Sequence, residues 1–305
     1  MFHLLLAILC SSSIALIFKY SESKNINRYA LTSSNYFAAS SISLILILTE
    51  RVPFIKKPSI QAFNSQFSKV IIHNQGLFSP SASLVWAIMC GILFGLFFFS
   101  SFIYYQKSVK DNGAGLSGAF SKMGILIPMT FSIILWKETP TVLQWLGILL
   151  SLLSITIVNI SFDKKSVTKI NPSLLLLFFL GGMADFSNKF FQKYALLNHK
   201  NVFLFFIFFT AFIISAIFTI RGEKKIIKRD ILTGLAVGVP NFFSSFFLIL
   251  SLNSLTTSVV YPVFSAGSIV FINILSYIIF KEKLMPKEKL SLGFTIISLI
   301  FINIK

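Results

Sequence analysis

The sequence predicts an all-α membrane protein with ten transmembrane helices in two inverted five-helix repeats. Three observations lead to this prediction: the composition is strongly apolar, ten apolar segments follow one another, and the second half of the chain repeats the first. Of the 305 residues, 55% are hydrophobic and 12% are charged, and the mean hydropathy is +0.82. Soluble domains are roughly 25% charged. Most of this chain therefore has to be covered by lipid.

The apolar segments are continuous runs of about the length that crosses a bilayer as a helix. No lysine or arginine precedes the first run, so we expect it to be a retained span and not a cleaved signal. The expected spans are residues 2–18, 29–49, 83–106, 114–136, 141–161, 173–192, 201–220, 231–252, 255–280 and 287–304.

The connection 50–82 is the longest between spans. Apolar residues recur in it at helical spacing, from Ile60 and Phe63 to Val70, with polar residues on the other face. Pro58 and Ser59 are suited to begin a helix. We expect an amphipathic helix that lies in the membrane interface, because the segment is too polar to span. The alternative is a loosely ordered loop.

An internal repeat appears when the chain is shifted by 144 residues. The sequence FFSSF at 98–102 then falls on FFSSF at 242–246, and Lys137-Glu138 falls on Lys281-Glu282. One register without gaps holds across several spans. We therefore expect one repeat in residues 1–161, which includes the 50–82 connection, and a second in 173–305. Because each contains five spans, the second copy has to cross the membrane upside down, which is a transporter architecture.

The formal net charge of +17 does not indicate nucleic-acid binding, because the basic residues lie in short connections between apolar runs. Cys10 and Cys90 lie inside apolar segments, and the three histidines have no acidic partner at a catalytic or metal-ligand spacing. A phosphate-binding glycine loop is also missing from the sequence. We expect no enzyme activity, no metal and no cofactor.

The stretch 113–128 (GAGLSGAFSKMGILIP), followed by WKE at 136–138 and QWLG at 144–147, resembles the fourth span, acidic hairpin and fifth span of the EamA-type ten-helix carriers of the drug/metabolite transporter superfamily. A second copy lies in 258–282 and 290–304. The resemblance implies secondary transport of small metabolites, often the export of amino acids or related compounds. It implies no particular substrate.

Asp185 and Lys189 are ionisable residues inside the sixth span, where such groups suggest function by default. Their i, i+4 spacing places them on one helix face and predicts an ion pair close to the midplane of the bilayer. One interpretation is a substrate-binding or proton-coupling pair facing a cavity. The other is a structural pair that packs against a neighbouring helix.

Lys122 lies in the fourth span, and it either lines a cavity or extends its side chain to the headgroups. If the substrate carries a carboxylate, Lys122 is the expected partner. Ser121, Asn241 and Ser265 offer neutral polar contacts. We expect the first, third, fourth, sixth, eighth and ninth spans to line a central polar pocket, and the fifth and tenth to be peripheral. Glu138 and Glu282 are expected to cap helices or to pair locally.

The sequence thus predicts a secondary active transporter of the cytoplasmic membrane that moves a small metabolite, with protons as a candidate coupling ion. The alternatives are a flippase component for a lipid-linked intermediate and a passive channel. Basic residues are more frequent on the side of the first connection, which places both termini outside. The basic 50–82 connection and the layout of the resembling family favour the opposite orientation.

Overall fold

The computed structural model describes residues 1–22, 27–50, 57–112, 114–159, 172–222, 225–280 and 286–303. These ranges are helical apart from short connections, and they contain no strand. Their elements are α1 (Phe2–Glu22), α2 (Arg28–Glu50), α3 (Ile60–Phe67), the π-helix η2 (Ser68–Ile72), α4 (Pro80–Asn112), α5 (Ala114–Met123), α6 (Leu126–Trp136), α7 (Val142–Asn159), α8 (Pro172–Tyr194), the 3-10 turn η3 (Leu197–His199), α9 (Lys200–Arg221), α10 (Lys228–Ser254), α11 (Thr257–Phe280) and α12 (Pro286–Asn303). The predicted all-α class is confirmed.

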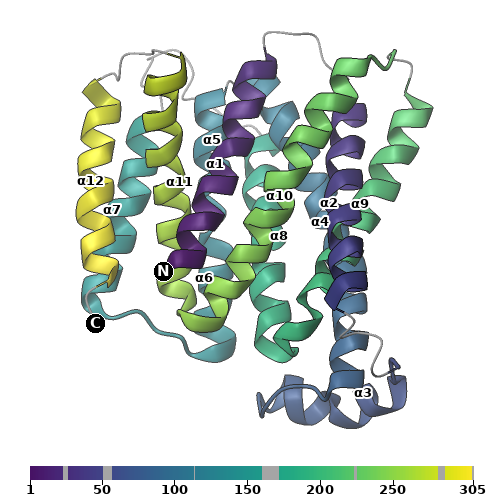
Figure 1. Cartoon of the computed structure of the whole chain (residues 1–305). Helices are drawn as coiled ribbons and strands as arrows, with labels where there is room; N and C mark the ends of the chain where they lie inside the picture. The colour runs from purple at the N-terminus through teal and green to yellow at the C-terminus, as the bar shows by residue number, and fades with distance from the viewer. Residues whose placement is uncertain are drawn as a thin grey trace.

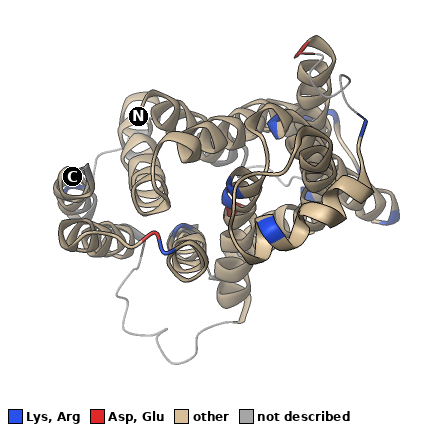
Figure 2. Cartoon of the chain, turned by 90° about the horizontal axis from the view of Figure 1, so that it is seen from below, with Lys and Arg blue, Asp and Glu red and all other residues tan. Residues whose placement is uncertain are grey.

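The long helices run side by side in one bundle (Figure 1). Helix α1 begins and α12 ends at the end drawn lowest, and α3 lies across this same end. We call it the α3 end. Viewed from the α3 end, the ribbons carry few charged segments (Figure 2). Helices α7 and α12 pack on each other at one edge of the bundle.

Length and composition mark the chain as a multi-pass membrane protein. Within the described residues, the helices long and apolar enough to cross a membrane are Arg28–Glu50, Pro80–Ser108, Pro172–Tyr194, Leu197–Arg221, Lys228–Ser254 and Thr257–Ile279. Shorter apolar helices occur at Phe2–Ile17, Phe120–Trp136, Val142–Ile157 and Gly293–Ile302. Each of these helices coincides with a segment that the sequence predicts as a span.

The segment predicted as the fourth span is broken into α5 and α6. Pro128 has no N–H to donate to the carbonyl of Gly124, as a continuous helix would require. That carbonyl instead accepts a hydrogen bond from Ile127 N at 3.0 Å, and Gly124 N donates to Ser121 O at 3.2 Å. The resulting turn packs on α8, where a Cβ added at Gly182 would lie 2.5 Å from Gly124 O. Such breaks in a span are tolerated where protein or a cavity covers the backbone.

The 50–82 connection contains the expected amphipathic helix. Ser59 caps α3 by accepting a hydrogen bond from Ala62 N at 3.2 Å. Phe63 is buried and its ring contacts those of Phe78 and Trp86, whereas Ile60 and Phe67 are exposed. The segment therefore packs against the bundle through Phe63 and Val70, and it presents other apolar side chains outward. Residues 51–56 of the connection lie outside the described residues.

Glycines let two pairs of helices approach closely. On α4, a Cβ added at Gly91 would lie 2.9 Å from Phe203 O of α9, and one at Gly95 would lie 2.8 Å from Ile207 O. On α10, a Cβ added at Gly238 would lie 2.5 Å from both Asn35 O and Ala38 Cβ of α2. Small residues at helix contacts are the usual means of close packing in membranes.

The close contact at Gly238 predicts that replacing this glycine by alanine destabilises the protein, although such a replacement usually stabilises a helix. In an open helical position, glycine-to-alanine replacement stabilises by about 0.5–1 kcal/mol. Gly238→Ala should instead lower the free energy of unfolding by about 1–3 kcal/mol, because its methyl group would overlap α2. Thermal unfolding in detergent measures the change. Gly293→Ala is the matched control, because within the described residues no atom beyond its own stretch of helix lies within 4 Å of its added Cβ. Equal melting temperatures for the two variants would contradict the close packing.

Candidate functional site

A cavity of about 200 Å³ lies in the middle of the bundle. It is lined by α1, α4, α5, α8, α10 and α11, as the sequence predicts, and also by Tyr36 of α2. Its polar lining consists of Ser11, Ser101, Ser121, Lys122, Asp185, Asn188, Asn241, Ser244, Ser245 and Ser265, together with Tyr36. Its apolar lining consists of Ile14, Phe98, Phe102, Ile125, Ala184, Leu248 and Phe264, with Gly181.

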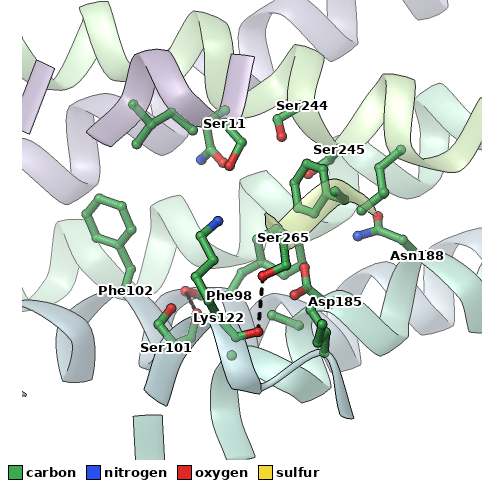
Figure 3. Close-up of a pocket in the computed structure, with 18 of the residues that line it drawn as sticks. Ser11, Phe98, Ser101, Phe102, Lys122, Asp185, Asn188, Ser244, Ser245 and Ser265 are labelled. Carbon is green, nitrogen blue, oxygen red and sulfur yellow. Dashed lines mark hydrogen bonds between the residues drawn. The ribbon is translucent and has the colours of Figure 1, made fainter. Parts of the chain in front are cut away.

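Two opposite charges face this cavity (Figure 3). Lys122 stands at the end of α5, just before the break, and its ammonium lies 5.4 Å from the centre of the Phe264 ring. Asp185 stands on α8, and its backbone carbonyl accepts a hydrogen bond from the Tyr261 hydroxyl at 2.7 Å. The two charges attract each other, but among the described residues neither makes an ion pair within 4 Å. Neither charge is therefore neutralised by a direct ion pair within the described residues.

Neutral groups around these charges are largely held by other helices. Ser265 Oγ donates to Lys122 O at 3.2 Å, which connects α11 to the backbone beside the break. Asn241 Nδ2 donates to Asn35 Oδ1 at 3.1 Å. Asn188 differs, because within the described part of the chain its buried Oδ1 has no hydrogen-bond partner. A buried acceptor without a partner is destabilising unless a ligand or water satisfies it.

The predicted pairing of Asp185 with Lys189 is wrong. Lys189 Nζ lies 2.8 Å from Oε1 of Glu138. Glu138 belongs to the connection between α6 and α7. Oε2 of Glu138 accepts hydrogen bonds from Ser132 Oγ at 2.8 Å and from Thr257 N at 3.2 Å. Spacing along one helix makes two residues neighbours, but here the packing of α6 against α8 supplies Lys189 with a better-placed carboxylate from the connection after α6.

Burial alone would raise the pKa of Glu138, but the Lys189 ammonium and the hydrogen bonds from Lys189, Thr257 and Ser132 outweigh it and lower the pKa to about 2. Glu138 is thus ionised at every physiological pH. The ammonium groups of Lys189 and Lys193 also lie 5.5 and 5.8 Å from the centre of the Trp136 ring, within cation–π distance.

Of the residues that the sequence predicts for the site, Ser121, Lys122, Asp185, Asn241 and Ser265 line the cavity, and Lys189 does not. Glu282 lies outside the described residues. Asn188, Ser11, Ser244 and Ser245 also line the cavity but were not among the residues predicted for the site. Ser244 and Ser245 belong to the repeated FFSSF, and Asn188 follows Asp185 by three residues, which places it on the same face of α8.

Residues 172–304 match the model of the EamA-like transporter family, and this match supports membership in the drug/metabolite transporter superfamily. The resemblance found in the sequence is thereby confirmed. The family consists of membrane transporters of small molecules.

An uncharacterised protein of Haemophilus influenzae (strain ATCC 51907 / DSM 11121 / KW20 / Rd) is 23% identical over 301 residues, which cover 97% of this chain and 95% of that protein. A crystal structure of another protein, 13% identical, superposes with a TM-score of 0.68 over 99% of this chain and 97% of that chain. At that identity the likeness concerns the fold alone.

The lowered pKa of Glu138 predicts how pH changes stability. The carboxylate adds stability above its ordinary pKa of 4.5, and this stability is lost as the pH falls through about 2. Glu138→Gln should therefore be less stable than the wild type by roughly 3 kcal/mol, with a constant difference between about pH 8 and 5 and a shrinking one below 4.5. Thermal unfolding across this range measures it. A difference that already changes between pH 7 and 5 would contradict the ionised pair.

Proposed function

We propose that the protein is a secondary active transporter that exports a small zwitterionic metabolite, such as an amino acid, across the cytoplasmic membrane by alternating access. One observation carries this proposal: Lys122 and Asp185 present opposite charges to one central cavity without pairing with each other. The match of residues 172–304 to the EamA-like transporter family supports the transport of small molecules. The charges suggest which class of molecule.

A zwitterion satisfies both charges at once. Its carboxylate would pair with Lys122, and its ammonium would pair with Asp185 and donate to the free Oδ1 of Asn188. A ligand with a single charge would leave one buried charge without a partner, which is strongly unfavourable. Apolar residues such as Phe98, Phe102 and Leu248 could contact the rest of the molecule.

We propose that ten spans form two inverted repeats, 1–161 and 173–305, with the cavity between them. The packing supports this arrangement, because contacts come in equivalent pairs. Helix α4 packs on α9 through Gly91 and Gly95, and its counterpart α10 packs on α2 through Gly234 and Gly238. Likewise, α1 packs on α10 and α8 packs on α4. A pseudo-two-fold axis that exchanges the halves would generate both sets of contacts.

We propose that Asp185 couples transport to protons. A carboxylate in the middle of a span can change its protonation state when water reaches it from one side or the other. If the substrate ammonium and a proton compete for Asp185, the carrier returns protonated after it has released its substrate. An inward proton gradient would then drive export.

The zwitterion proposal predicts matched changes in selectivity. In proteoliposomes, counterflow of each of the common amino acids is compared with that of its amide and its N-acetyl derivative. Lys122→Gln should remove the preference for the free carboxylate, and Asp185→Asn the preference for the free amine. Each should weaken half-saturation by the amino acid roughly 30-fold, or about 2 kcal/mol. Lys107→Gln, on an exposed lysine, is the control.

Wild-type selectivity in both variants would overturn the assignment. Translocation of labelled phospholipid without amino-acid flux would favour the flippase alternative, because a lipid has to enter sideways between helices. Flux of every derivative at the same rate would favour a passive channel.

Proton coupling is tested separately. Asp185→Asn should lose uphill transport driven by a pH gradient, because it removes the titrating group, and should keep exchange at saturating substrate. Accumulation under an imposed pH gradient and exchange without one are measured on the same proteoliposomes, with Glu50→Gln as the charge control. Uphill transport at the wild-type rate in Asp185→Asn would exclude the coupling role.

A further inference from the structure

The Glu138–Lys189 pair lies next to the cavity, toward the α3 end. Lys189 follows the cavity residue Asn188 directly and stands one turn beyond Asp185 on α8. Thr257 is the first residue of α11, two turns before Ser265. Glu138 follows the last turn of α6. All three helix ends meet at the α3 end of the bundle (Figure 1).

The contacts of Glu138 join the two halves of the chain across this end. Glu138 and Ser132 come from the first half, whereas Lys189 and Thr257 come from the second. Lys189 and Thr257 are 4% and 0% exposed, so the contact itself is shielded from solvent. A carboxylate that accepts hydrogen bonds from three elements fixes them in one arrangement.

We propose that Glu138, with Lys189 and the backbone of Thr257, is the gate that closes the cavity toward the α3 end. This proposal rests on the proposed transport function. Opening requires Glu138 to leave Lys189, which separates the C-terminal end of α6 from α8 and α11. Water that enters replaces the lost partners of both charges, so the pair is needed only while the gate is closed and dry.

The surface segment that contains α3 braces this gate from outside. The indole N–H of Trp136 donates to the Tyr194 hydroxyl at 2.9 Å, which donates to Asn74 Oδ1 at 2.8 Å. Asn74 Nδ2 donates to Leu135 O at 3.3 Å. Asn74 adopts the left-handed conformation, with φ of 53°, which asparagine tolerates better than most residues. Asn74 thus holds the last turn of α6, and Trp136 in it, against the end of α8.

Accessibility of the cavity tests the gate without any substrate. In a Cys10→Ser, Cys90→Ala background, a Ser121→Cys reporter in the cavity is labelled by a membrane-impermeant maleimide in membrane vesicles of both orientations. Asn64→Cys on the exposed face of α3 identifies the vesicles whose outer side is the α3 side. Glu138→Gln should raise the labelling rate of the reporter several-fold from the α3 side alone. Asn74→Ala should raise it less, because it removes only the brace.

Two further variants keep the outcome decisive. Glu50→Gln removes the more exposed Glu50–Lys200 pair, whose atoms are 3.7 Å apart, and should leave labelling unchanged. Glu138→Gln combined with Lys189→Gln removes the pair without stranding a buried charge, so it should fold and still label fast. Wild-type labelling in that double variant, or an equal increase from both sides, would overturn the gate. Failure of the transport proposal would instead appear as absent flux with the labelling pattern intact.

Discussion

An ionised side chain inside a bilayer finds no solvent, so its partner has to come from the protein or from a ligand. Helix α8 carries two such groups one turn apart and meets this constraint in two ways. Lys189 has Glu138 at 2.8 Å, and Glu138 in turn holds Ser132 and the start of α11. Asp185 faces the cavity with its charge available. The closed end of the bundle and the charged cavity are therefore two results of one constraint.

The broken fourth segment brings the opposite charge to the same place. Pro128 removes one backbone hydrogen bond, and the turn at Gly124 packs closely against Gly182 of α8 because neither residue has a side chain. Lys122 lies two residues before that turn, and Ser265 binds its carbonyl. Lys122 thus lines the cavity just before the break, together with Asp185 of α8.

Features that depend on neighbouring residues could be predicted from the sequence, whereas features that depend on contacts between distant segments could not. Continuous apolar runs predicted every long helix, because burial in lipid acts on each segment by itself. The capping residue Ser59 and the spacing of Phe63 predicted α3 for the same local reason. The prediction of an Asp185–Lys189 ion pair was wrong, because the partner of Lys189 is determined by packing between segments far apart in sequence. The position of the break also required Gly182, which carries no signal for it in the sequence.

The cavity and the gate share α8, and this has a consequence for alternating access. Asn188 and Lys189 are consecutive residues of one helix, so a rotation or tilt of α8 that changes the contacts of the first also moves the second. A zwitterion brings no net charge to Lys122 and Asp185, so occupancy need not disturb the neighbouring Glu138–Lys189 pair by a long-range field. What occupancy can change is the position of α8, through direct contact with Asp185 and Asn188. If the proposed site and gate operate, contact through this single helix couples binding to gating, in addition to the charge that Asp185 loses when it binds a proton.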